Sequence, residues 1–342
     1  MKLEKFIVPI KHILPPAIKN MGRDEYETEI RIHPLLKAFW AAIAPVRAEY
    51  KPHIIPEGLL NDVMIPRSHN FADPEKLTPA DPLYNQIQVN DAVVFPNLWS
   101  WTKMAICRIT GNNEESVLLK DIKLKQLYDA FICSQQFFEL QYAHSMKNKF
   151  YPTIGMNFLR PAAASVVHPH FQLLILPIPP PLVALTLQES RKYYKKYRKS
   201  FFTAYVERER DGPRWIGEIG NGAEGISWVS PWAPLAGTDE VLFIQDTYSA
   251  FPLSEEIWKN LAEGLHKIFV GYHEIGVYSI NLIIGSEVYG ITNKAFRVFG
   301  MIWSRPLRNL DINDRGFPEL GFKIALTSRS PENIAADLRK FW

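Results

Sequence analysis

Two histidines and a glutamine alternate in the segment His168-Pro169-His170-Phe171-Gln172. In an extended strand, residues two apart point to the same side, so both imidazoles and the amide would share one face. A neutral imidazole can attack phosphorus, and an amide donor can hold a phosphate oxygen without changing its own protonation. The pattern therefore suits covalent transfer of a phosphate-containing group to His170. On these residues alone, satisfied polar core residues or two metal ligands are equally admissible interpretations.

The elements around this segment predict an α+β protein built from two related halves. Apolar patterns predict strands and helices in one order, which is then repeated: strands at 89–95 and 104–109, a helix at 121–142, antiparallel strands at 153–157 and 166–176, then strands at 226–232 and 240–245, a helix at 254–274, and strands at 278–284 and 296–303. Met156-Asn157 has a counterpart in Ile280-Asn281, and 168–172 has one in 297–301. We interpret this order as an internal duplication in which the first copy alone keeps its histidines.

This pattern divides the chain into three parts. Residues 1–28 are expected to form an irregular N-terminal arm, because their prolines break any helical period. Residues 29–186 form the catalytic half, and residues 187–342 form the second half. Prolines also recur from 51 to 82, which predicts a long structured loop kept for function or for a subunit contact.

Composition is that of a folded, water-soluble protein. Of the 342 residues, 47% are apolar and 22% are charged, and the net charge of +3 gives no field that would concentrate the chain on nucleic acid or an anionic membrane. Cys107 and Cys133 fit neither a disulfide framework nor a metal motif. The longest apolar run, 171–187, is interrupted by four prolines, which argues against a membrane helix. No secretory signal is visible at the N-terminus, so we expect a cytoplasmic protein without nucleic-acid or membrane partners.

Two further patterns are assigned ordinary structural roles. The basic and aromatic run at 191–199 is interpreted as a solvated helix linking the halves rather than as a nucleic-acid surface. The glycines between 217 and 225 are followed by a strand and by no Lys-Ser/Thr pair, so they predict a hairpin turn rather than a phosphate loop.

The stretch Asn-Phe-Leu-Arg-Pro-Ala-Ala-Ala-Ser-Val-Val-His-Pro-His-Phe-Gln, residues 157–172, resembles the active-site stretch of galactose-1-phosphate uridylyltransferases, a branch of the histidine-triad superfamily. The resemblance implies that His170 is the nucleotidylated residue and that the backbone carbonyl of His168 orients its ring. It also implies that Asn157, Ser165 and Gln172 hold the ribose or the phosphates. The implied fold is two histidine-triad-like halves, each an antiparallel sheet with packed helices.

The resemblance extends over most of the chain. Residues 30–48 look like the family's opening strand pair, which implies that Arg47 reaches the nucleotide phosphates across a homodimer interface, with Lys51 a weaker candidate. Val-Phe-Pro-Asn at 94–97 looks like the family's nucleoside-binding turn, which implies that Asn97 lies near the base or ribose.

The stretch 320–339 resembles the family's closing strand, loop and helix, so Phe322, Lys323 and Arg329 are candidates for the acceptor or sugar loop. Phe322 and Lys323 stand where galactose-handling relatives place Tyr and Glu against the sugar. Loss of that carboxylate removes a hydroxyl acceptor, which argues against galactose. The gained Lys323 favours a more anionic acceptor.

Metal ligands of the family are missing. Relatives often build a zinc site from a Cys pair, a later His and the first His of the active motif, but residues 51–62 contain no cysteine and Asn112 or Asn113 stands near the later His. An iron-type site in the second half needs histidines that Ile283 and the strand at 296–303 do not supply. We expect no zinc or iron and no required cofactor, although Mg²⁺ is compatible with the chemistry.

These inferences predict a ping-pong nucleotidyltransferase. A nucleoside monophosphate, with UMP favoured, would move between a nucleotide sugar and a phosphate acceptor such as a hexose 1-phosphate. The alternatives are an adenylyl-transferring phosphorylase or hydrolase of the same superfamily and a non-catalytic nucleotide-binding homologue.

Overall fold

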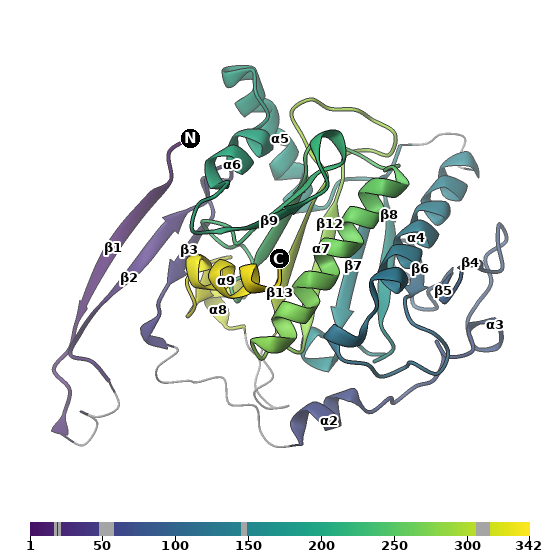
Figure 1. Ribbon diagram of the computed structural model, residues 1–342, viewed down its shortest axis with the longest axis horizontal. Helices are drawn as coiled ribbons and strands as arrows, with labels where there is room; N and C mark the ends of the chain where they lie inside the picture. The colour runs from purple at the N-terminus through teal and green to yellow at the C-terminus, as the bar shows by residue number, and fades with distance from the viewer. Residues whose placement is uncertain (17–18, 20–21, 48–57, 145–148, 306–314) are drawn as a thin grey trace.

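The computed structural model describes residues 1–16, 19, 22–47, 58–144, 149–305 and 315–342. A ten-stranded antiparallel sheet runs through both halves of the chain (Figure 1). Its strands follow one another across the sheet in the order β4 (Ile87–Val89), β5 (Ala92–Pro96), β6 (Lys103–Arg108), β8 (His170–Leu176), β7 (Tyr151–Phe158), β12 (Ile280–Gly285), β13 (Phe299–Ser304), β11 (Val241–Gln245), β10 (Ile226–Val229) and β9 (Trp215–Ile219).

The strand order is symmetric about the central pair β7 and β12, which confirms the two related halves and the α+β class. Gly155 and Ile283 face each other across this pair. Gln172 pairs with Gly155, and Met301 pairs with Ile283, so Gln172 and Met301 occupy equivalent positions in the two halves. The expected correspondence of 168–172 with 297–301 therefore agrees with the strand register.

The other expected correspondence, of Asn157 with Asn281, does not share this register. Asn157 and Asn281 are partners directly opposite each other in the β7–β12 ladder. The register that makes Gln172 equivalent to Met301 makes Asn157 equivalent to Gly285 instead. In that register the two asparagines are neighbours across the junction of the halves, and Gly285 is the equivalent of Asn157.

Two long helices, α4 (Leu124–His144) and α7 (Glu255–Glu274), lie side by side on one face of the sheet (Figure 1). Phe131 of α4 stacks on Phe171 of β8 and on Trp258 of α7, with ring centroids 5.0 Å apart in both pairs. Ser254 caps α7 by accepting a hydrogen bond from the backbone N–H of Ile257. Both helices were expected, and their apolar faces form the main core.

The opposite face is covered differently in each half. In the second half, α5 (Pro181–Tyr197) and α6 (Phe201–Glu209) pack on it. In the first half, Phe71 from the connection after α2 (Leu59–Met64) packs on Phe95 and Ile106. Helix α5 is continuous across residues 186 and 187, so the expected boundary between the halves falls inside a helix.

Two local expectations needed correction, and a third was confirmed. The expected strand at 89–95 is a hairpin of β4 and β5, since Asn90 has a positive φ of 52° and supplies the tight turn. Strand β8 begins at His170 rather than at 166, because Pro169 has no N–H for the ladder. The glycine-containing connection at 217–225 is a β-hairpin between β9 and β10, as expected.

The N-terminal arm is not irregular. β1 (Glu4–Lys11) pairs along its whole length with β2 (Glu25–Ile32), and this hairpin projects from the body of the molecule (Figure 1). Pro9 is tolerated because β1 is the edge strand, where a missing N–H costs no ladder bond. The four-stranded sheet is completed by β3 (Trp40–Ile43) and β14 (Ala325–Thr327).

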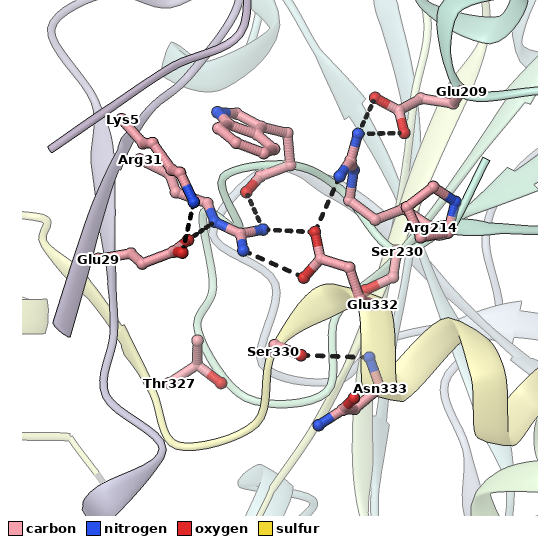
Figure 2. A network of polar contacts seen from close by, with 12 residues as sticks. Lys5, Glu29, Arg31, Glu209, Arg214, Ser230, Thr327, Ser330, Glu332 and Asn333 are labelled. Carbon is pink, nitrogen blue, oxygen red and sulfur yellow. Dashed lines mark hydrogen bonds and ion pairs between the residues drawn. The ribbon is translucent and has the colours of Figure 1, made fainter. Parts of the chain in front are cut away.

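A buried ionic network fastens this small sheet to the second half (Figure 2). Glu332 of α9 (Pro331–Leu338) accepts hydrogen bonds from Arg31 of β2 at 2.9 Å and from Arg214 at 2.8 Å. Arg214 also donates to Glu209 at 3.0 Å. Both guanidinium groups lie near the Trp232 ring, 4.4 and 4.9 Å from its centroid. The remaining short helices are α3 (Pro74–Leu77) and α8 (Phe317–Leu320).

In the described parts of the chain, every helix is too short or too polar to traverse a lipid bilayer.

Candidate active site

His170 is the first residue of β8 and lies on the sheet face opposite α4. Its neighbour Phe171 points to the helix side and stacks on Phe131, so alternation directs His170 and Gln172 to the other face. His170 is 4% exposed. The Phe71 ring meets the imidazole edge to face at a centroid distance of 5.0 Å. An aromatic lid thus covers one side of the ring, which sequence reasoning did not anticipate.

A backbone hydrogen bond fixes the tautomer of His170. Its Nδ1 lies 2.7 Å from the backbone carbonyl oxygen of His168, and a carbonyl can only accept, so Nδ1 carries the proton. This is the orienting contact that the sequence predicted. The lone pair is then on Nε2, which makes no hydrogen bond within the described residues. Burial lowers the pKa of His170 below its ordinary value of 6.5, so the ring is neutral and nucleophilic at pH 7.

His168 occupies a bend before β8 rather than the strand position that was expected. It is 1% exposed, and its Nε2 lies 3.3 Å from the carbonyl oxygen of Thr110. Burial first, and the nearby Arg108 guanidinium second, lower the pKa of His168 to about 4. Its Nδ1 is buried and has no hydrogen-bond partner among the residues that the structure describes. His168 thus contacts the imidazole of His170 through its backbone carbonyl.

Arg108 is a site residue that sequence reasoning missed. It is the direct cross-strand neighbour of His170 and is 3% exposed. Its guanidinium donates to the carbonyl of Phe71 at 2.9 Å, to Asn112 Oδ1 at 2.5 Å and to the carbonyl of Asp91 at 3.1 Å. Arg108 thereby holds the segment that places Phe71 over the histidine. The available signal was a lone cation inside an otherwise apolar predicted strand.

Two of the predicted phosphate or ribose residues lie on the same face as His170. Gln172 is half-buried, and its side chain makes no hydrogen bond in the described part of the chain. Beside it, a Cβ atom at Gly155 would meet only the carbonyl of Leu282, at 3.7 Å, so the sheet surface is open there. Continuing the β7–β8 register by two residues brings Asn157 opposite His170. Ser165 is exposed in the loop between these strands.

The other predicted nucleotide residues lie further from the histidine. Asn97 follows β5, and its Nδ2 lies 3.3 Å from the sulfur of Met104. Met104 is four residues along β6 from Arg108, a separation of about 13 Å in a strand. Arg47 is exposed after β3 and so belongs to the four-stranded sheet rather than to the sheet that carries His170. Lys51 lies outside the described residues.

The three residues predicted for the acceptor or sugar loop lie in different environments. Phe322 is 72% exposed, and Lys323 is exposed beside a mainly apolar pocket between α5 and β14. Arg329 donates to Asp239 at 2.9 Å and to Asp337 at 2.5 Å, so its charge is used in packing α9. Neither the two ion pairs of Arg329 nor the exposed positions of Phe322 and Lys323 bring these residues to the imidazole of His170.

The described residues contain no group of three His, Cys, Asp or Glu side chains placed to hold a metal ion. The unpartnered Nδ1 of His168 would be one ligand, but the Arg108 guanidinium beside it disfavours a second cation. Asn112, which stands near the family's zinc histidine, accepts a hydrogen bond from that arginine. These residues do not fit a zinc site, although residues 51–57 lie outside the described ranges, and the absence of a metal stays a prediction.

Comparison with known proteins places the fold. No family model matches the chain. An uncharacterised protein of Archaeoglobus fulgidus is 24% identical over 256 residues, which cover 74% of this chain and 73% of that protein. An ADP-glucose phosphorylase from Arabidopsis thaliana, with bound ADP-glucose, has a TM-score of 0.72 at 18% identity over 92% of this chain and 98% of its own.

Two further solved structures share the architecture. A GalT-like protein from Arabidopsis thaliana has a TM-score of 0.69 at 18% identity, covering 91% of this chain and 98% of its own. A uridylyltransferase has a TM-score of 0.65 at 19% identity, covering 91% and 97%. The resemblance to uridylyltransferases is thus confirmed at the level of the fold.

Proposed function

We propose that this protein is a nucleotidyltransferase that works through a covalent nucleotidyl-histidine intermediate at His170. The observation that carries the proposal is the hydrogen bond from Nδ1 to the carbonyl of His168, which leaves the Nε2 lone pair of a neutral, buried imidazole for attack. The shared fold with a uridylyltransferase and an ADP-glucose phosphorylase supports the same class of chemistry.

In the first half-reaction, Nε2 of His170 attacks the α-phosphorus of a nucleotide sugar. The N–P bond forms as the bond from the α-phosphorus to the bridging oxygen breaks, and a sugar 1-phosphate leaves. No proton needs to be removed, because Nδ1–H stays on the ring and the carbonyl of His168 stabilises the positive charge that develops there. In the second half-reaction, an oxygen of an acceptor phosphate attacks the same phosphorus and the N–P bond breaks.

The neighbouring side chains supply donors for the phosphates. Gln172, half-buried beside His170 and without a partner in the described chain, is proposed to donate to a non-bridging oxygen as charge develops. Asn157 and Ser165 are proposed to hold the ribose or the phosphates. Arg47 reaches this site only from a second subunit in our proposal, since it belongs to the other sheet. A homodimer follows from that assignment, and sedimentation of the purified protein tests it.

The nucleobase separates two versions of the proposal. Our first expectation is a uridylyltransferase that moves UMP between a nucleotide sugar and a hexose 1-phosphate or a more anionic acceptor. The likeness to an ADP-glucose phosphorylase favours a second version, in which AMP is transferred from an ADP-sugar to inorganic phosphate. The contacts of Asn97 do not decide between them, because its amide faces Met104.

One labelling experiment tests both versions. The protein is incubated separately with UDP-glucose and ADP-glucose that carry ³²P in the α-phosphate, without added metal. We expect acid-labile, alkali-stable label on His170 with one donor, and its discharge by glucose 1-phosphate or inorganic phosphate. Nucleotide binding without label, in folded protein, would instead support a non-catalytic binding protein. Elemental analysis of the same preparation is expected to show no stoichiometric zinc or iron.

A further inference from the structure

Asn281 lies in the second half yet contacts a predicted ligand-binding residue of the first half. Its Nδ2 donates to Asn157 Oδ1 at 2.7 Å and to the carbonyl oxygen of Ala162 at 2.9 Å. Its own Oδ1 accepts from Nη1 of Arg305 at 3.0 Å. Asn281 is 7% exposed, so these three contacts are made away from bulk water. Both N–H groups of this amide and its oxygen therefore have partners.

The partners allow only one orientation of the Asn281 amide. A backbone carbonyl can only accept, so Ala162 requires the NH₂ group of Asn281. A guanidinium can only donate, so Arg305 requires the oxygen. Turning the amide over would set donor against donor at Arg305 and acceptor against acceptor at Ala162. Two independent contacts thus fix the direction of donation. The flipped orientation would leave buried polar groups unsatisfied, which costs free energy of folding.

This direction passes on to Asn157. Because Asn281 presents N–H to it, Asn157 must offer Oδ1 across the β7–β12 junction. Its Nδ2 then faces the half-buried sheet surface beside His170 and makes no hydrogen bond in the described part of the chain. An amide held in this way supplies donors only, which suits a phosphate or ribose oxygen.

We infer that Asn281, aligned by Arg305, is a positioning residue that turns the Asn157 amide so that Nδ2 faces the bound nucleotide. The inference rests on the proposed function for the identity of the ligand. It gives the second half a part in the site although that half carries none of the reacting groups. The same amide also anchors the turn at Arg160–Ala162, which leads into the loop that carries Ser165.

Affinity for ADP and for UDP, measured by titration calorimetry, tests the inference through a double-mutant cycle. Asn157→Ala is expected to weaken binding about tenfold, the scale of a hydrogen bond to a charged group. Asn281→Leu, which keeps the volume but loses the donor, is expected to weaken binding by a smaller factor, and to cause no further loss in the Asn157→Ala background. Asn281→Asp, an acceptor only, is expected to recruit Nδ2 of Asn157 and to match Asn157→Ala.

Asn260→Leu is the matched control. Asn260 is also buried in the second half and donates to a backbone carbonyl, that of Glu224, at 3.0 Å. This variant should lose stability without losing affinity. Additive losses in the cycle, or affinity of Asn281→Leu and Asn281→Asp within twofold of the wild type, would overturn the inference.

A second measurement decides the matter if neither nucleotide binds. Side-chain amide exchange in the ligand-free protein, followed by NMR with asparagine-selective ¹⁵N labelling, should show protected Asn281 NH₂ protons and rapidly exchanging Asn157 NH₂ protons. The reverse pattern would contradict the assigned direction of donation. Loss of the proposed function would appear as no label on His170 and no nucleotide binding, whatever the exchange pattern.

Discussion

The first residues of β8 and β13 occupy equivalent positions, but the first is polar and the second is apolar. In the first half, His170 pairs with Arg108 across β6; in the second, Phe299 pairs with Ile244 across β11. Phe299 packs against Phe202, with ring centroids 5.9 Å apart, in an apolar cluster. One backbone frame thus carries a polar site in one half and a packed core in the other.

The residues just before β8 and β13 make a similar contact in both halves. His168 Nε2 approaches the carbonyl of Thr110 at 3.3 Å, and Nε of Arg297 donates to the carbonyl of Asp246 at 2.6 Å. A side-chain contact to the neighbouring strand end is therefore present in both halves. The difference is that, among the described residues, the side chain of Gln172 and Nδ1 of His168 make no hydrogen bond in the first half. Unsatisfied polar groups of this kind concentrate at functional sites.

The largest contrast is expected between His170→Asn and Phe299→Leu. The asparagine variant loses the nucleophile, so the rate of label formation should fall by at least about 10³-fold with little change in stability. Phe299→Leu should keep the label and lose about 1–2 kcal/mol of unfolding free energy through poorer packing. Phosphorimaging and urea unfolding measure the two effects. Label retained in His170→Asn would remove His170 from the proposed chemistry.

The buried imidazole of His168 predicts a dependence of stability on pH. Its pKa of about 4 lies below the ordinary 6.5, so the folded state favours the neutral ring. The contribution is complete above pH 6.5 and is lost as pH falls towards 4, by a total on the order of 3 kcal/mol. Urea unfolding between pH 7 and 4 should show this slope in the wild type and a reduced slope in His168→Asn. Equal slopes would count against a neutral buried His168.

The equivalent pair Gln172 and Met301 allows a sharper test of the phosphate donors. Gln172→Leu should slow label formation on the order of 10²-fold, the effect of removing one donor to developing charge. Met301→Leu, a volume-conserving change at the equivalent position, should alter the rate less than about twofold. Single-turnover kinetics with a saturating donor compare the two. Equal rates for both variants would show that Gln172 does not contact the reacting phosphate.

The smallest effect is expected at the ionic network that joins the four-stranded sheet to the second half (Figure 2). Glu332→Gln removes a carboxylate shared by Arg31 and Arg214, while Glu29 and Glu209 continue to pair with those arginines. Because both charges stay compensated, the loss should be about 1–2 kcal/mol of unfolding free energy, without change in labelling. Urea unfolding measures it, and altered labelling would connect the network to the site.

The sequence predicted the regular elements and the reacting histidine because both leave local signals. Apolar periodicity defined α4 and α7, and strand alternation placed His170 and Gln172 on one face. The N-terminal strand β1 was missed because Pro9 signals a break locally, whereas an edge strand tolerates it. That tolerance depends on the whole sheet.

The supporting residues were missed for a related reason. Arg108 lies some 60 positions before His170, and Asn281 lies 124 positions after Asn157, so only the strand order brings each pair together. The sequence predicted that Asn281 is the counterpart of Asn157 in the second half. The order of elements along the chain does not distinguish an equivalent residue from a cross-strand partner. In the register that equates Gln172 with Met301, Asn281 is the cross-strand partner of Asn157 and Gly285 is its equivalent.

The β7–β12 ladder also limits how this chain can be divided. Five residue pairs join the halves there, from Ile280 with Phe158 to Ile284 with Ile154. A fragment containing only the first half would expose β7 as a bare edge, with unpaired N–H and C=O groups along an apolar strand. Such an edge recruits another strand, so the fragment is expected to self-associate or aggregate. The second half therefore covers the edge of the first half's sheet, and because both halves belong to one chain, β12 stays close to β7.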